Sequence, residues 1–417
     1  MTSVLVSPGD LHGEVSAPGS KSFTQRAVLI SAFSSTPLSL SNVAFCDDDM
    51  VSIEIARKCG LAVSTSKASL KISGEFRHPD RLYAGESGTS YRLVIGLLAG
   101  KRCTVDIEVS RQLARRPIHP LLNALSERGL TYSMNDLTLH LDGSRITSGM
   151  IRIDGSESSQ FVSSSILFQS MVGDNGIVRI INRIASRGYV NLTAVIISKF
   201  GPSVTETVDG FTVSGEFHHA PLSLSVDGDF SSAGFLFAGG LLCSPDGIIV
   251  NGLRHDSVQP DSSILQMIPC NGEGNSEGSY TVAKRPLEVI TVDAASNPDL
   301  APPIAVLGMF SDAGCRIMNP GRLRGKESDR YADIKKLAHA FGSRIQDSGD
   351  LLFIRKGDST IFPESLDFTE HRMIMAGIIA GMASGKPVMH SNVEKITKSY
   401  PSFLSDLKRL GAGVDFL

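Results

Sequence analysis

Two kinds of helical segment alternate along the chain, and the first kind is amphipathic and ends in a glycine. The copies lie at residues 55–60, 125–129, 197–201, 336–342 and 407–411, with a weaker copy at 265–272. Their terminal glycines follow one another at intervals of 69–72 residues. A glycine directly after an amphipathic run is typical of the left-handed position that ends a helix. We therefore expect six amphipathic helices, each ended by a glycine.

The second kind of segment is apolar on all sides and begins at small or polar residues. These segments start near Ser22, Thr89, Ser159, Ser231, Asp299 and Glu370, at intervals of 67–72 residues. Residues 165–172 and 373–380 show the pattern most clearly, because neither run has a polar face. A helix that is hydrophobic all round is a buried helix. Short β-like runs such as 137–141 and 177–181 predict strands between the helices.

The regular spacing predicts six copies of one unit, each with two helices and about four strands. A unit of about 70 residues cannot bury both of its helices alone, and 417 residues exceed the usual size of one core. We expect an α/β (α+β) protein of two domains with three copies each, in which buried helices lie inside and sheets outside. The N-termini of the buried helices would then converge, which favours anion binding. A repeat scaffold for protein binding is the alternative, although solenoid repeats are usually about 20–50 residues long.

Composition limits the classes of function. The net charge of −3 argues against a nucleic-acid-binding surface. The six cysteines are scattered without a C-x-x-C motif, which fits reduced thiols better than disulfides or a zinc site. Residues 1–12 lack the basic and apolar regions of a signal peptide, and no apolar run reaches the roughly 18 residues that span a membrane. We expect a cytoplasmic protein with no nucleic-acid or membrane partner.

The start of the first apolar segment holds the most distinctive chemistry. A Pro18-Gly19 turn leads into Ser20-Lys21-Ser22, and Arg26 follows one helical turn later. Free N–H groups at a helix start, hydroxyls and cations together form an anion site. It is not a Walker A loop, because no glycine directly precedes the lysine. An ordinary N-cap with a solvated lysine and arginine is the other interpretation.

Other helix starts repeat this polar composition. A glycine-rich turn at 85–92 lets backbone N–H groups approach an oxyanion, and hydroxyls recur at 156–160, 186–189 and 229–233. Each alone is more readily explained as an N-cap than as a site. Residues 322–330 hold four cations and two carboxylates, which could also be a solvated loop with local ion pairs. Further cations stand at residues 115–116 and 371–372, before helical segments, so the pattern indicates a multiply anionic small molecule as the ligand.

Ten short motifs in order carry a resemblance to a known family. They are Pro18-Gly19-Ser20-Lys21-Ser22 with Arg26, Gly85-x-Ser87-Gly88-Thr89 with Arg92, Arg116-Pro117-Ile118, Ser158-Ser159-Gln160, Ser186-x-x-Tyr189, Gly228-Asp229-x-Ser231-Ser232, Pro298-Asp299, Lys326-Glu327-Ser328-Asp329-Arg330, His371-Arg372-Met373 and Thr397-Lys398-x-x-Pro401. The chain resembles the 5-enolpyruvylshikimate-3-phosphate synthase family (3-phosphoshikimate 1-carboxyvinyltransferases) along essentially its full length. The resemblance implies a two-domain inside-out α/β fold of six βαβαββ repeats, three per domain, with buried parallel helices and outer sheets.

The resemblance also implies a reaction and its binding residues. The enolpyruvyl group of phosphoenolpyruvate would be transferred to the 5-hydroxyl of shikimate 3-phosphate, with release of phosphate, in chorismate and aromatic amino acid biosynthesis. The residues implied for shikimate 3-phosphate are Lys21, Ser22, Arg26, Ser158, Ser159, Gln160, Ser186, Asp299 and Lys326. Those implied for phosphoenolpyruvate are Lys21, Gly88, Arg116, Gln160, Arg330, Arg372 and Lys398.

The implied chemistry is an addition followed by an elimination through a tetrahedral intermediate. It requires a base for the 5-hydroxyl and an acid for the methylene carbon. The resemblance assigns Asp299 to the hydroxyl and Glu327 to the methylene proton, and Lys21 supports the developing charge. It implies no metal and no organic cofactor, and a monomer is expected because the active cleft would lie within one chain.

Three positions depart from the family's usual residues. Glu86 stands where asparagine is common, Leu93 where proline is frequent, and Arg322 where asparagine is common. These departures bear on substrate affinity and on the response to phosphonate inhibitors rather than on the reaction.

Two rival interpretations make different predictions. The related enzymes that transfer enolpyruvyl to UDP-N-acetylglucosamine carry a catalytic cysteine shortly before an Arg-Pro motif. Here residues 109–115 contain no cysteine, and the nearest one is Cys103. A six-repeat scaffold without catalysis would leave Asp299 and Glu327 dispensable.

The family's chain crosses between domains twice. The expected domains are residues 1–17 with 226–417, and residues 18–225. The crossings near 17–19 and 226–228 are glycine-containing turns suited to a hinge. We therefore expect the domains to close on shikimate 3-phosphate.

Overall fold

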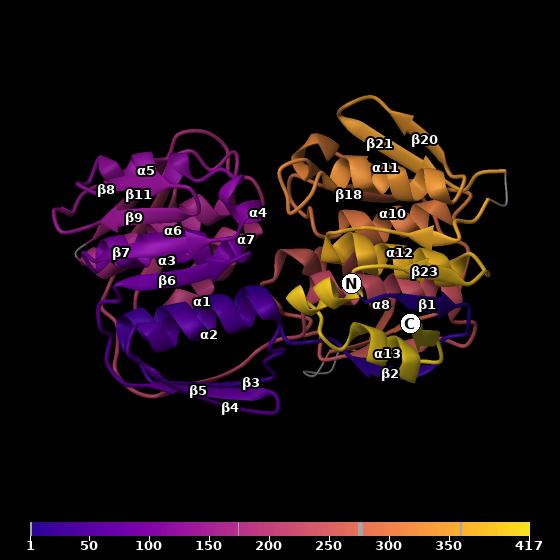
Figure 1. Cartoon of the computed structure of the whole chain (residues 1–417), viewed down its shortest axis with the longest axis horizontal. Helices are drawn as coiled ribbons and strands as arrows, with labels where there is room; N and C mark the ends of the chain where they lie inside the picture. The colour runs from indigo at the N-terminus through magenta and orange to yellow at the C-terminus, as the bar shows by residue number, and fades with distance from the viewer. Residues whose placement is uncertain (1, 174, 274–277, 359–360) are drawn as a thin grey trace. The chain divides into compact units, whose positions relative to one another are not determined.

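The computed structural model describes residues 2–173, 175–273, 278–358 and 361–417. The chain folds into two compact units, which Figure 1 draws in the colours of the sequence. Unit 1 consists of residues 1–19 and 227–417, and unit 2 of residues 20–226. Within the described residues, no helix has the length and apolar character needed to cross a membrane.

Unit 2 contains three buried helices, further helices near its surface, and three sheets among its described residues. Its strands are β3 (Leu38–Ser41), β4 (Ala62–Ser66), β5 (Ser69–Ser73), β6 (Arg81–Gly85), β7 (Thr104–Val109), β8 (Thr131–Asn135), β9 (Thr138–Asp142), β10 (Ile151–Ile153), β11 (Gly176–Ile180), β12 (Ser203–Thr207), β13 (Gly210–Ser214) and β14 (Leu222–Ser225). Its helices are α1 (Lys21–Ser34), α2 (Asp47–Lys58), α3 (Gly88–Gly100), α4 (Arg111–Ala114), α5 (His119–Ser126), α6 (Ser159–Val172) and α7 (Gly188–Ser198).

Unit 1 has the same arrangement of helices and sheets, but two separate parts of the chain form it. Its strands are β1 (Val4–Ser7), β2 (Gly13–Ser16), β15 (Ile248–Asn251), β16 (Asn271–Glu273), β17 (Ser279–Val282), β18 (Ile290–Asp293), β19 (Cys315–Met318), β20 (Arg344–Asp347), β21 (Leu351–Arg355), β22 (Ser365–Leu366), β23 (Val388–His390) and β24 (Gly413–Phe416). Its helices are α8 (Phe230–Cys243), α9 (Ile264–Met267), α10 (Ala301–Met309), α11 (Arg330–Ala340), α12 (His371–Ala383) and α13 (Phe403–Arg409), with 3₁₀ segments η1 (Pro260–Ser263), η2 (Pro320–Leu323) and η3 (Val393–Lys398).

The six four-stranded sheets found in the described part of the chain share one topology. In the order β6-β7-β9-β8, for example, β6 and β7 pair in parallel through the crossover helix α3, and the remaining pairs are antiparallel. The order β10-β11-β13-β12 has the same pattern around α6. This is the predicted βαβαββ repeat, with the parallel pair joined by a buried helix as such crossovers require.

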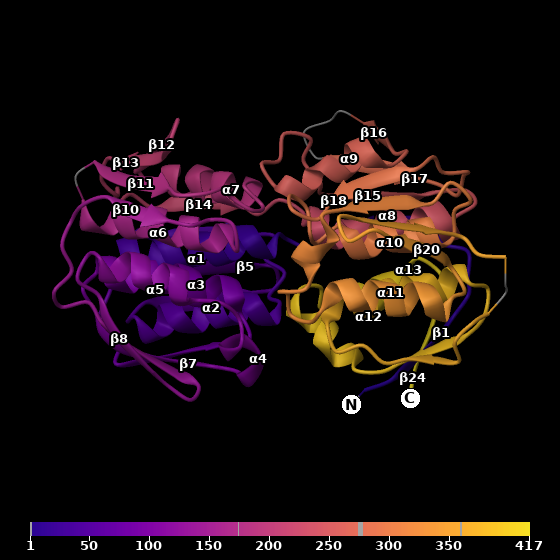
Figure 2. The ribbon, with the colours of Figure 1, turned by 90° about the horizontal axis from the view of Figure 1, so that it is seen from above.

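The buried helices form the core of each unit. In unit 1, α8, α10 and α12 pack against one another, and in unit 2, α3 packs against both α1 and α6. Figures 1 and 2 show these helices inside each unit and the strands around them. Every residue of α10 and all but one of α12 is buried, because these sequences have no polar face to turn outward. The fold class predicted from the sequence is confirmed.

One predicted helix end is wrong. Gly60, Gly129, Gly201, Gly342 and Gly411 do have positive φ after amphipathic helices. Gly272, in contrast, lies in strand β16, because α9 has only four residues and ends at Met267. Pro269 explains the early end, since proline lacks an N–H donor and restricts the residue before it.

Two strands complete sheets far from their own repeats in the sequence. Strand β2 precedes α1 but pairs in parallel with β15 of unit 1. Strand β14 precedes α8 but pairs in parallel with β3 of unit 2. The chain passes from one unit to the other directly after each of these strands, so the two crossings stand at equivalent points of the repeat.

Candidate active site

In unit 1, the starts of three helices bring together a cluster of charged side chains. Asp299 stands two residues before α10, Arg330 is the first residue of α11, and Glu370 caps α12, where its Oε2 accepts from the Met373 N–H at 3.0 Å. Arg372 lies in the first turn of α12. The repeat therefore positions these residues, because each occupies a helix start of a common architecture.

Arg330 is the centre of this cluster. Its Nη1 donates to Asp299 Oδ1 at 2.8 Å and to the carbonyl of Pro298 at 3.1 Å. Its Nη2 lies 3.1 Å from Glu370 Oε1 and 3.3 Å from Glu327 Oε2. The side chain is buried, which by itself disfavours the charged form, but Glu370, Asp299 and Glu327 outweigh burial and raise the pKa of Arg330. A buried guanidinium is tolerated only with such partners.

Asp299 is held by two arginines. Its second oxygen, Oδ2, accepts from Arg372 Nη2 at 3.0 Å. Burial disfavours the ionised carboxylate, but the charges of Arg372, Arg330 and Lys326 outweigh it and lower the pKa of Asp299 below its ordinary value. The side chain remains 22% exposed, so one part of this carboxylate can still meet a ligand.

A second carboxylate, that of Asp261, interacts with Asp299. Asp261 is fully buried, accepts from Ser231 Oγ at 2.5 Å through Oδ2, and accepts from Asn297 Nδ2 at 3.0 Å through Oδ1. Burial and the nearby charge of Asp299 raise the pKa of Asp261 to about 6, against the hydrogen bonds from Ser231 and Asn297. Asn297 also donates to the carbonyl of Pro260 at 2.9 Å. Asp261 thus fixes the turn that carries Asp299.

The remaining predicted residues of unit 1 lie on loops. Lys326 and Glu327 are half-buried in the loop between η2 and α11, and Lys326 is close enough to contribute to the lowered pKa of Asp299. Lys398 is the last residue of η3 and is 8% exposed.

In unit 2, the segment predicted to bind an anion forms the N-terminus of α1, and its lysine has an unexpected partner. Lys21 Nζ lies 2.9 Å from Asp48 Oδ2, and the two side chains are only 15% and 9% exposed. The Ser20 side chain does not cap the helix, so the N-cap interpretation does not describe it. Ser22 lies in the first turn of α1 and is half-buried.

Arg26 lies one helical turn after Ser22 and is buried against α7. Its Nε donates to Thr193 Oγ1 at 2.8 Å, its Nη1 to the carbonyl of Ser22 at 2.8 Å, and its Nη2 to that of Tyr189 at 3.3 Å. Burial lowers the pKa of the Arg26 guanidinium to about 10. None of these three acceptors is a carboxylate, which distinguishes Arg26 from Arg330.

The start of α3 brings Gly88, Arg116 and Gln160 together. A Cβ added to Gly88 would lie 2.7 Å from Arg116 Nη1 and 2.8 Å from Arg92 Nη1, so a larger residue would displace at least one of the guanidinium groups. Arg92 Nη1 donates to Gln160 Oε1 at 3.0 Å, and Gln160 Nε2 donates to Thr89 Oγ1 at 2.8 Å. Both ends of the Gln160 amide are therefore bound to residues of α3.

The predicted serines occupy two further helix starts of unit 2. Ser158 caps α6 by accepting from the Gln160 N–H at 3.2 Å, and Ser159 is buried beside it. Ser186 has a φ of 49°, the left-handed conformation, just before α7. The loop predicted at residues 186–189 is shorter than expected, because Gly188 and Tyr189 already belong to α7.

Four residues of these clusters were absent from the predicted site. Asp48 was hidden in an acidic run at a helix start, a composition typical of any helix N-terminus. Arg92 and Glu370 stand within motifs already identified in the sequence. Their closeness in sequence to Gly88 and Arg372 could therefore have indicated that they belong to the site. Asp261 carried no sequence signal, because its partners Ser231 and Asn297 are distant in the chain.

Metal ligation was tested across the described part of the chain. There, no group of three or more histidine, cysteine, aspartate or glutamate side chains could hold a metal ion. All six cysteines are free.

Comparisons with known proteins agree with one another. The family model for EPSP synthase (3-phosphoshikimate 1-carboxyvinyltransferase) matches residues 5–407. The 3-phosphoshikimate 1-carboxyvinyltransferase of Picrophilus torridus is 39% identical over 407 residues, which cover 96% of each chain. That of Halobacterium salinarum is 31% identical over 428 residues, covering 98% of this chain and 99% of the relative.

Two solved structures share the fold at low identity. EPSP synthase from Acinetobacter baumannii superposes with a TM-score of 0.80 at 19% identity and covers all of both chains. The enolpyruvyl transferase NikO from Streptomyces tendae superposes with a TM-score of 0.83 at 17% identity, covering 100% of this chain and 99% of the other.

Proposed function

The chain belongs to the EPSP synthase family, and from this membership we propose which of its residues bind and convert the substrates. The protein is a 3-phosphoshikimate 1-carboxyvinyltransferase of the shikimate pathway of aromatic amino acid biosynthesis. Its substrates, shikimate 3-phosphate and phosphoenolpyruvate, each carry a phosphate and a carboxylate. The site must therefore supply several cations and N–H donors that are held in place before the substrates arrive.

Phosphoenolpyruvate binds to the arginines and lysines of the helix starts. In our proposal Arg330 and Arg372 of unit 1 and Arg116 of unit 2 hold its anionic groups, with Lys398, Lys21, Gln160 and the N–H of Gly88. The close approach of Arg116 and Arg92 to Gly88 supports this, because a backbone without a Cβ can meet an oxyanion there.

Shikimate 3-phosphate binds mainly to hydroxyls and cations of unit 2. We assign this role to Lys21, Ser22, Arg26, Ser158, Ser159, Gln160 and Ser186, with Asp299 and Lys326 from unit 1. Arg26 supports the assignment, because a buried guanidinium held only by a hydroxyl and two carbonyls gains most from an incoming anion.

The proton transfers fall to two carboxyl groups. Asp299 removes the proton of the 5-hydroxyl as its oxygen bonds to C2 of phosphoenolpyruvate, and Glu327 donates a proton to the methylene carbon. The tetrahedral intermediate then breaks its bond to the phosphate oxygen, the leaving phosphate takes the proton held by Asp299, and a methyl proton returns to Glu327, which leaves the enolpyruvyl ether. Lys21 offsets the negative charge that develops during these steps.

One observation carries this mechanism: Asp299 is bound by two arginines, both of which are proposed to bind phosphoenolpyruvate. Without substrate, Arg330 and Arg372 keep the carboxylate weakly basic. When an anion shares these guanidinium groups, the pKa of Asp299 rises and the carboxylate becomes a better base. Substrate binding would thereby switch the base on.

The test measures phosphate release from phosphoenolpyruvate with shikimate 3-phosphate as the acceptor. We expect Asp299→Asn and Glu327→Gln each to lower the rate by about 10²- to 10⁴-fold, the usual contribution of a general acid or base. Asp350→Asn, a change of an exposed residue in the turn between β20 and β21, is the matched control and should keep full activity.

Other acceptors distinguish the rival functions. Phosphate release with UDP-N-acetylglucosamine in place of shikimate 3-phosphate would move the chain to the related transferases. Release with neither acceptor, from protein whose circular dichroism shows a folded state, would favour a scaffold without catalysis. Activity that survives in both carboxyl variants would refute the proposed roles.

The organisation around this site is part of the proposal. We propose that the domains are residues 1–17 with 226–417 and residues 18–225, joined by hinges near 17–19 and 226–228, and that the protein acts as a cytoplasmic monomer without metal or organic cofactor. The backbone contacts at the crossing support the hinge: Gly19 and Gly228 form an isolated bridge, and the Asp229 N–H donates to the carbonyl of Pro18 at 2.7 Å.

A further inference from the structure

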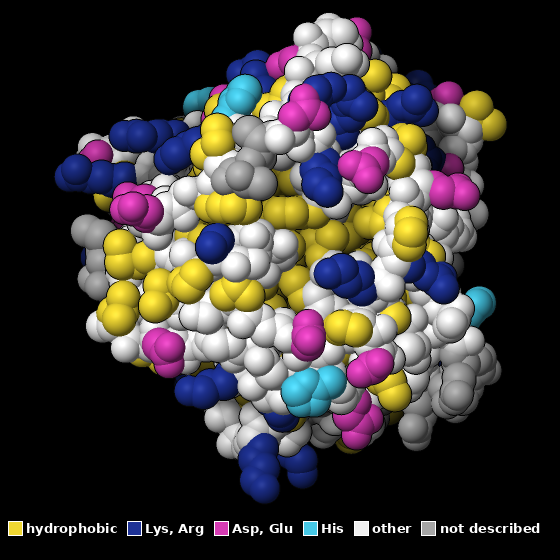
Figure 3. Space-filling view, turned by 90° about the vertical axis from the view of Figure 1, so that its right-hand side faces the viewer, with side chains coloured by type: hydrophobic (Ala, Val, Ile, Leu, Met, Phe, Trp, Pro, Cys, Tyr) yellow, Lys and Arg dark blue, Asp and Glu magenta, His cyan; other side chains and the backbone are white. Residues whose placement is uncertain are grey.

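Unit 1 has a cavity at the opposite end of its buried helices from the charged cluster. The cavity measures about 560 Å³, a size typical of small-molecule sites. Its lining includes the last turns of α8, α10 and α12, through Leu242, Met309 and Ala383. Figure 3 shows a hollow with a hydrophobic floor on one face of the molecule, with lysine or arginine side chains at its border.

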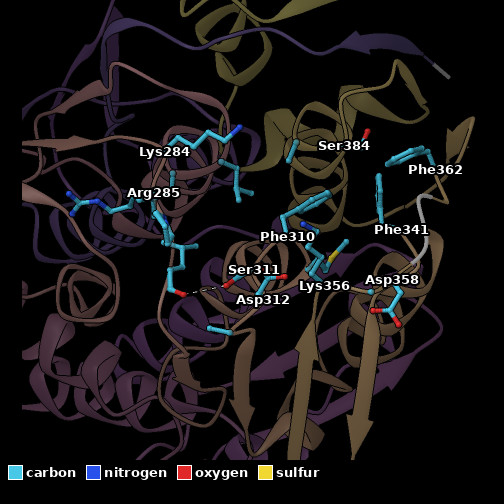
Figure 4. A pocket seen from close by; sticks show the side chains of 18 residues that line it. Lys284, Arg285, Phe310, Ser311, Asp312, Phe341, Lys356, Asp358, Phe362 and Ser384 are labelled. Carbon is cyan, nitrogen blue, oxygen red and sulfur yellow. Dashed lines mark hydrogen bonds between the residues drawn. The ribbon is translucent and has the colours of Figure 1, made fainter.

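Aromatic and aliphatic side chains form the floor. The rings of Phe310 and Phe341 meet edge to face, with centroids 5.7 Å apart. Leu242 and Met309 continue this surface, and Figure 4 shows Phe362 beside Phe341. An edge-to-face pair in an open cavity offers a ring of similar size a further aromatic contact. The floor therefore favours an apolar, preferably aromatic, body.

The rim of the cavity is basic. Lys284, Arg285 and Lys356 are exposed, and none of them takes part in an ion pair recorded among the described residues. Two acidic residues, Asp312 and Asp358, also line the cavity. Asp358 is already paired with Arg344. In Figure 4, Arg285 extends away from the phenylalanine rings, which leaves Lys284 and Lys356 as the nearer cations.

Backbone hydrogen bonds fix the two lysines at the cavity. The Lys284 N–H donates to the carbonyl of Ser244, just after α8, at 2.7 Å, and the Lys356 N–H donates to that of Ser311, just after α10, at 3.0 Å. These bonds hold the backbones of both lysines beside the C-terminal ends of α8 and α10, where a cation is favourable. The same helix ends repel a dianion such as phosphate more strongly than a single carboxylate, so a ligand with one negative charge fits this rim better.

We propose that this cavity binds a small aromatic carboxylate, with its ring on the Phe310–Phe341 floor and its carboxylate between Lys284 and Lys356. The site is separate from the transferase chemistry, because α10 alone rises roughly 12 Å between Ala301, beside Asp299, and Met309. The proposal does not depend on the proposed roles of the site residues.

The test is a titration with naphthalene-2-carboxylate, followed by its own fluorescence in a chain that contains no tryptophan. Saturating shikimate 3-phosphate is present, so that the transferase site is occupied. We expect saturable binding of one equivalent. In the double variant Lys284→Met and Lys356→Met the dissociation constant should rise about tenfold, since two rim ion pairs are lost while the apolar stems remain.

Three comparisons make the test decisive. Lys58→Met, a change of an exposed lysine at the end of α2, should leave binding unchanged. The neutral 2-naphthalenemethanol should bind the wild type and the double variant equally. Leu242→Glu, which places a negative charge on the floor, should abolish naphthoate binding while phosphate release stays at the wild-type rate.

Other outcomes would overturn the proposal. Binding that the double variant leaves unchanged would mean that the lysines only complement the helix ends. Loss of naphthoate binding as the protein concentration rises, together with dimers in sedimentation, would mean that a second copy covers the cavity. Binding that is seen only when shikimate 3-phosphate is omitted would place the ligand in the transferase site instead.

Discussion

At the residue scale, the two largest fully buried cations, Arg330 and Arg26, are stabilised in different ways. Arg330 has three carboxylates around it, and their charges outweigh the effect of burial and raise its pKa. Arg26 has a hydroxyl and two carbonyls, and burial lowers its pKa to about 10. The first arrangement stabilises the folded state without a ligand, whereas the second is completed only by an anion.

Asp261 should control the pH dependence of the reaction. Its pKa of about 6 means that its carboxyl gains a negative charge as the pH rises through 6. A second negative charge beside Asp299 makes that carboxylate more basic, so kcat/KM should rise with pH in this range. In Asp261→Asn the inflection near pH 6 should disappear. A pH–rate profile for both proteins checks this.

The conservative change keeps the hydrogen bonds of the cluster within reach, so a purely structural role would lower activity equally at every pH. An inflection near pH 6 that persists in Asp261→Asn would assign that titration to another group. Asp350→Asn, on the exposed turn, serves again as the control.

Asp49 should make the protein less stable as the pH rises. Burial raises the pKa of this fully buried carboxyl at the start of α2 to about 8, although Cys46 and Lys21 favour the ionised form. Between pH 4 and pH 8 the unfolded chain therefore loses a proton that the folded chain keeps, and the free energy of unfolding falls. From pH 5 to pH 8 the Asp49 contribution to this fall should amount to about 2–4 kcal/mol.

Urea denaturation at pH 5 and pH 8 measures this contribution. In Asp49→Asn the decrease between the two pH values should be smaller by that amount. Asp47→Asn removes an exposed carboxylate from the same helical turn and should leave the wild-type decrease in place. Equal pH dependence in all three proteins would show that Asp49 is ionised in the folded state.

At the element scale, the close contact of α3 with α6 depends on small residues. The Gly96 N–H donates to Ser164 Oγ at 3.1 Å, and this hydroxyl donates to the carbonyl of Arg92 at 2.6 Å. A Cβ at Gly96 would lie 2.1 Å from the Ser164 carbonyl oxygen. Contact between their backbones thus holds α3, which begins at Gly88, to α6, which begins at Ser159.

Gly96→Ala should therefore destabilise the protein by about 1–3 kcal/mol, the usual cost of overpacking. It should also raise the KM for phosphoenolpyruvate, because α3 carries Gly88 at its start. Gly321→Ala is the control, since a Cβ there meets no atom within 4 Å. Urea midpoints and initial rates measure both effects, and an unchanged midpoint would show that α3 and α6 separate without cost.

Most elements could be predicted from the sequence, because burial and helix ends leave local patterns. The six apolar helices begin within about two residues of their predicted starts, such as Lys21 for Ser22 and Ala301 for Asp299. The exchange of β2 and β14 could not be predicted, since a hydrophobic pattern does not name the partner of a strand. The site was predictable where motifs carried it, while Asp261 and Asp48 act through contacts between distant segments.

At the scale of the whole molecule, the chain makes two units from six repeats and divides the proposed site residues between them. Asp299, Lys326, Glu327, Arg330, Arg372 and Lys398 belong to unit 1, and the others to unit 2. Each unit has its own core, so each can keep its fold while the other moves. Only the two crossings, at 19–20 and 226–227, join them covalently.

Shikimate 3-phosphate should therefore reduce the relative motion of the units. Its proposed contacts include Arg26 of unit 2 and Lys326 of unit 1. One ligand molecule can contact both residues only when the two units bring them close enough together. A charge-assisted contact of this kind contributes about 1.5–3 kcal/mol, enough to shift a two-state equilibrium by tenfold or more.

Small-angle scattering should show a smaller radius of gyration with shikimate 3-phosphate. Inorganic phosphate at equal ionic strength is the control, because it carries only one anionic group. If the radius is the same with both ligands, shikimate 3-phosphate does not draw the units together, and the proposed closure is refuted.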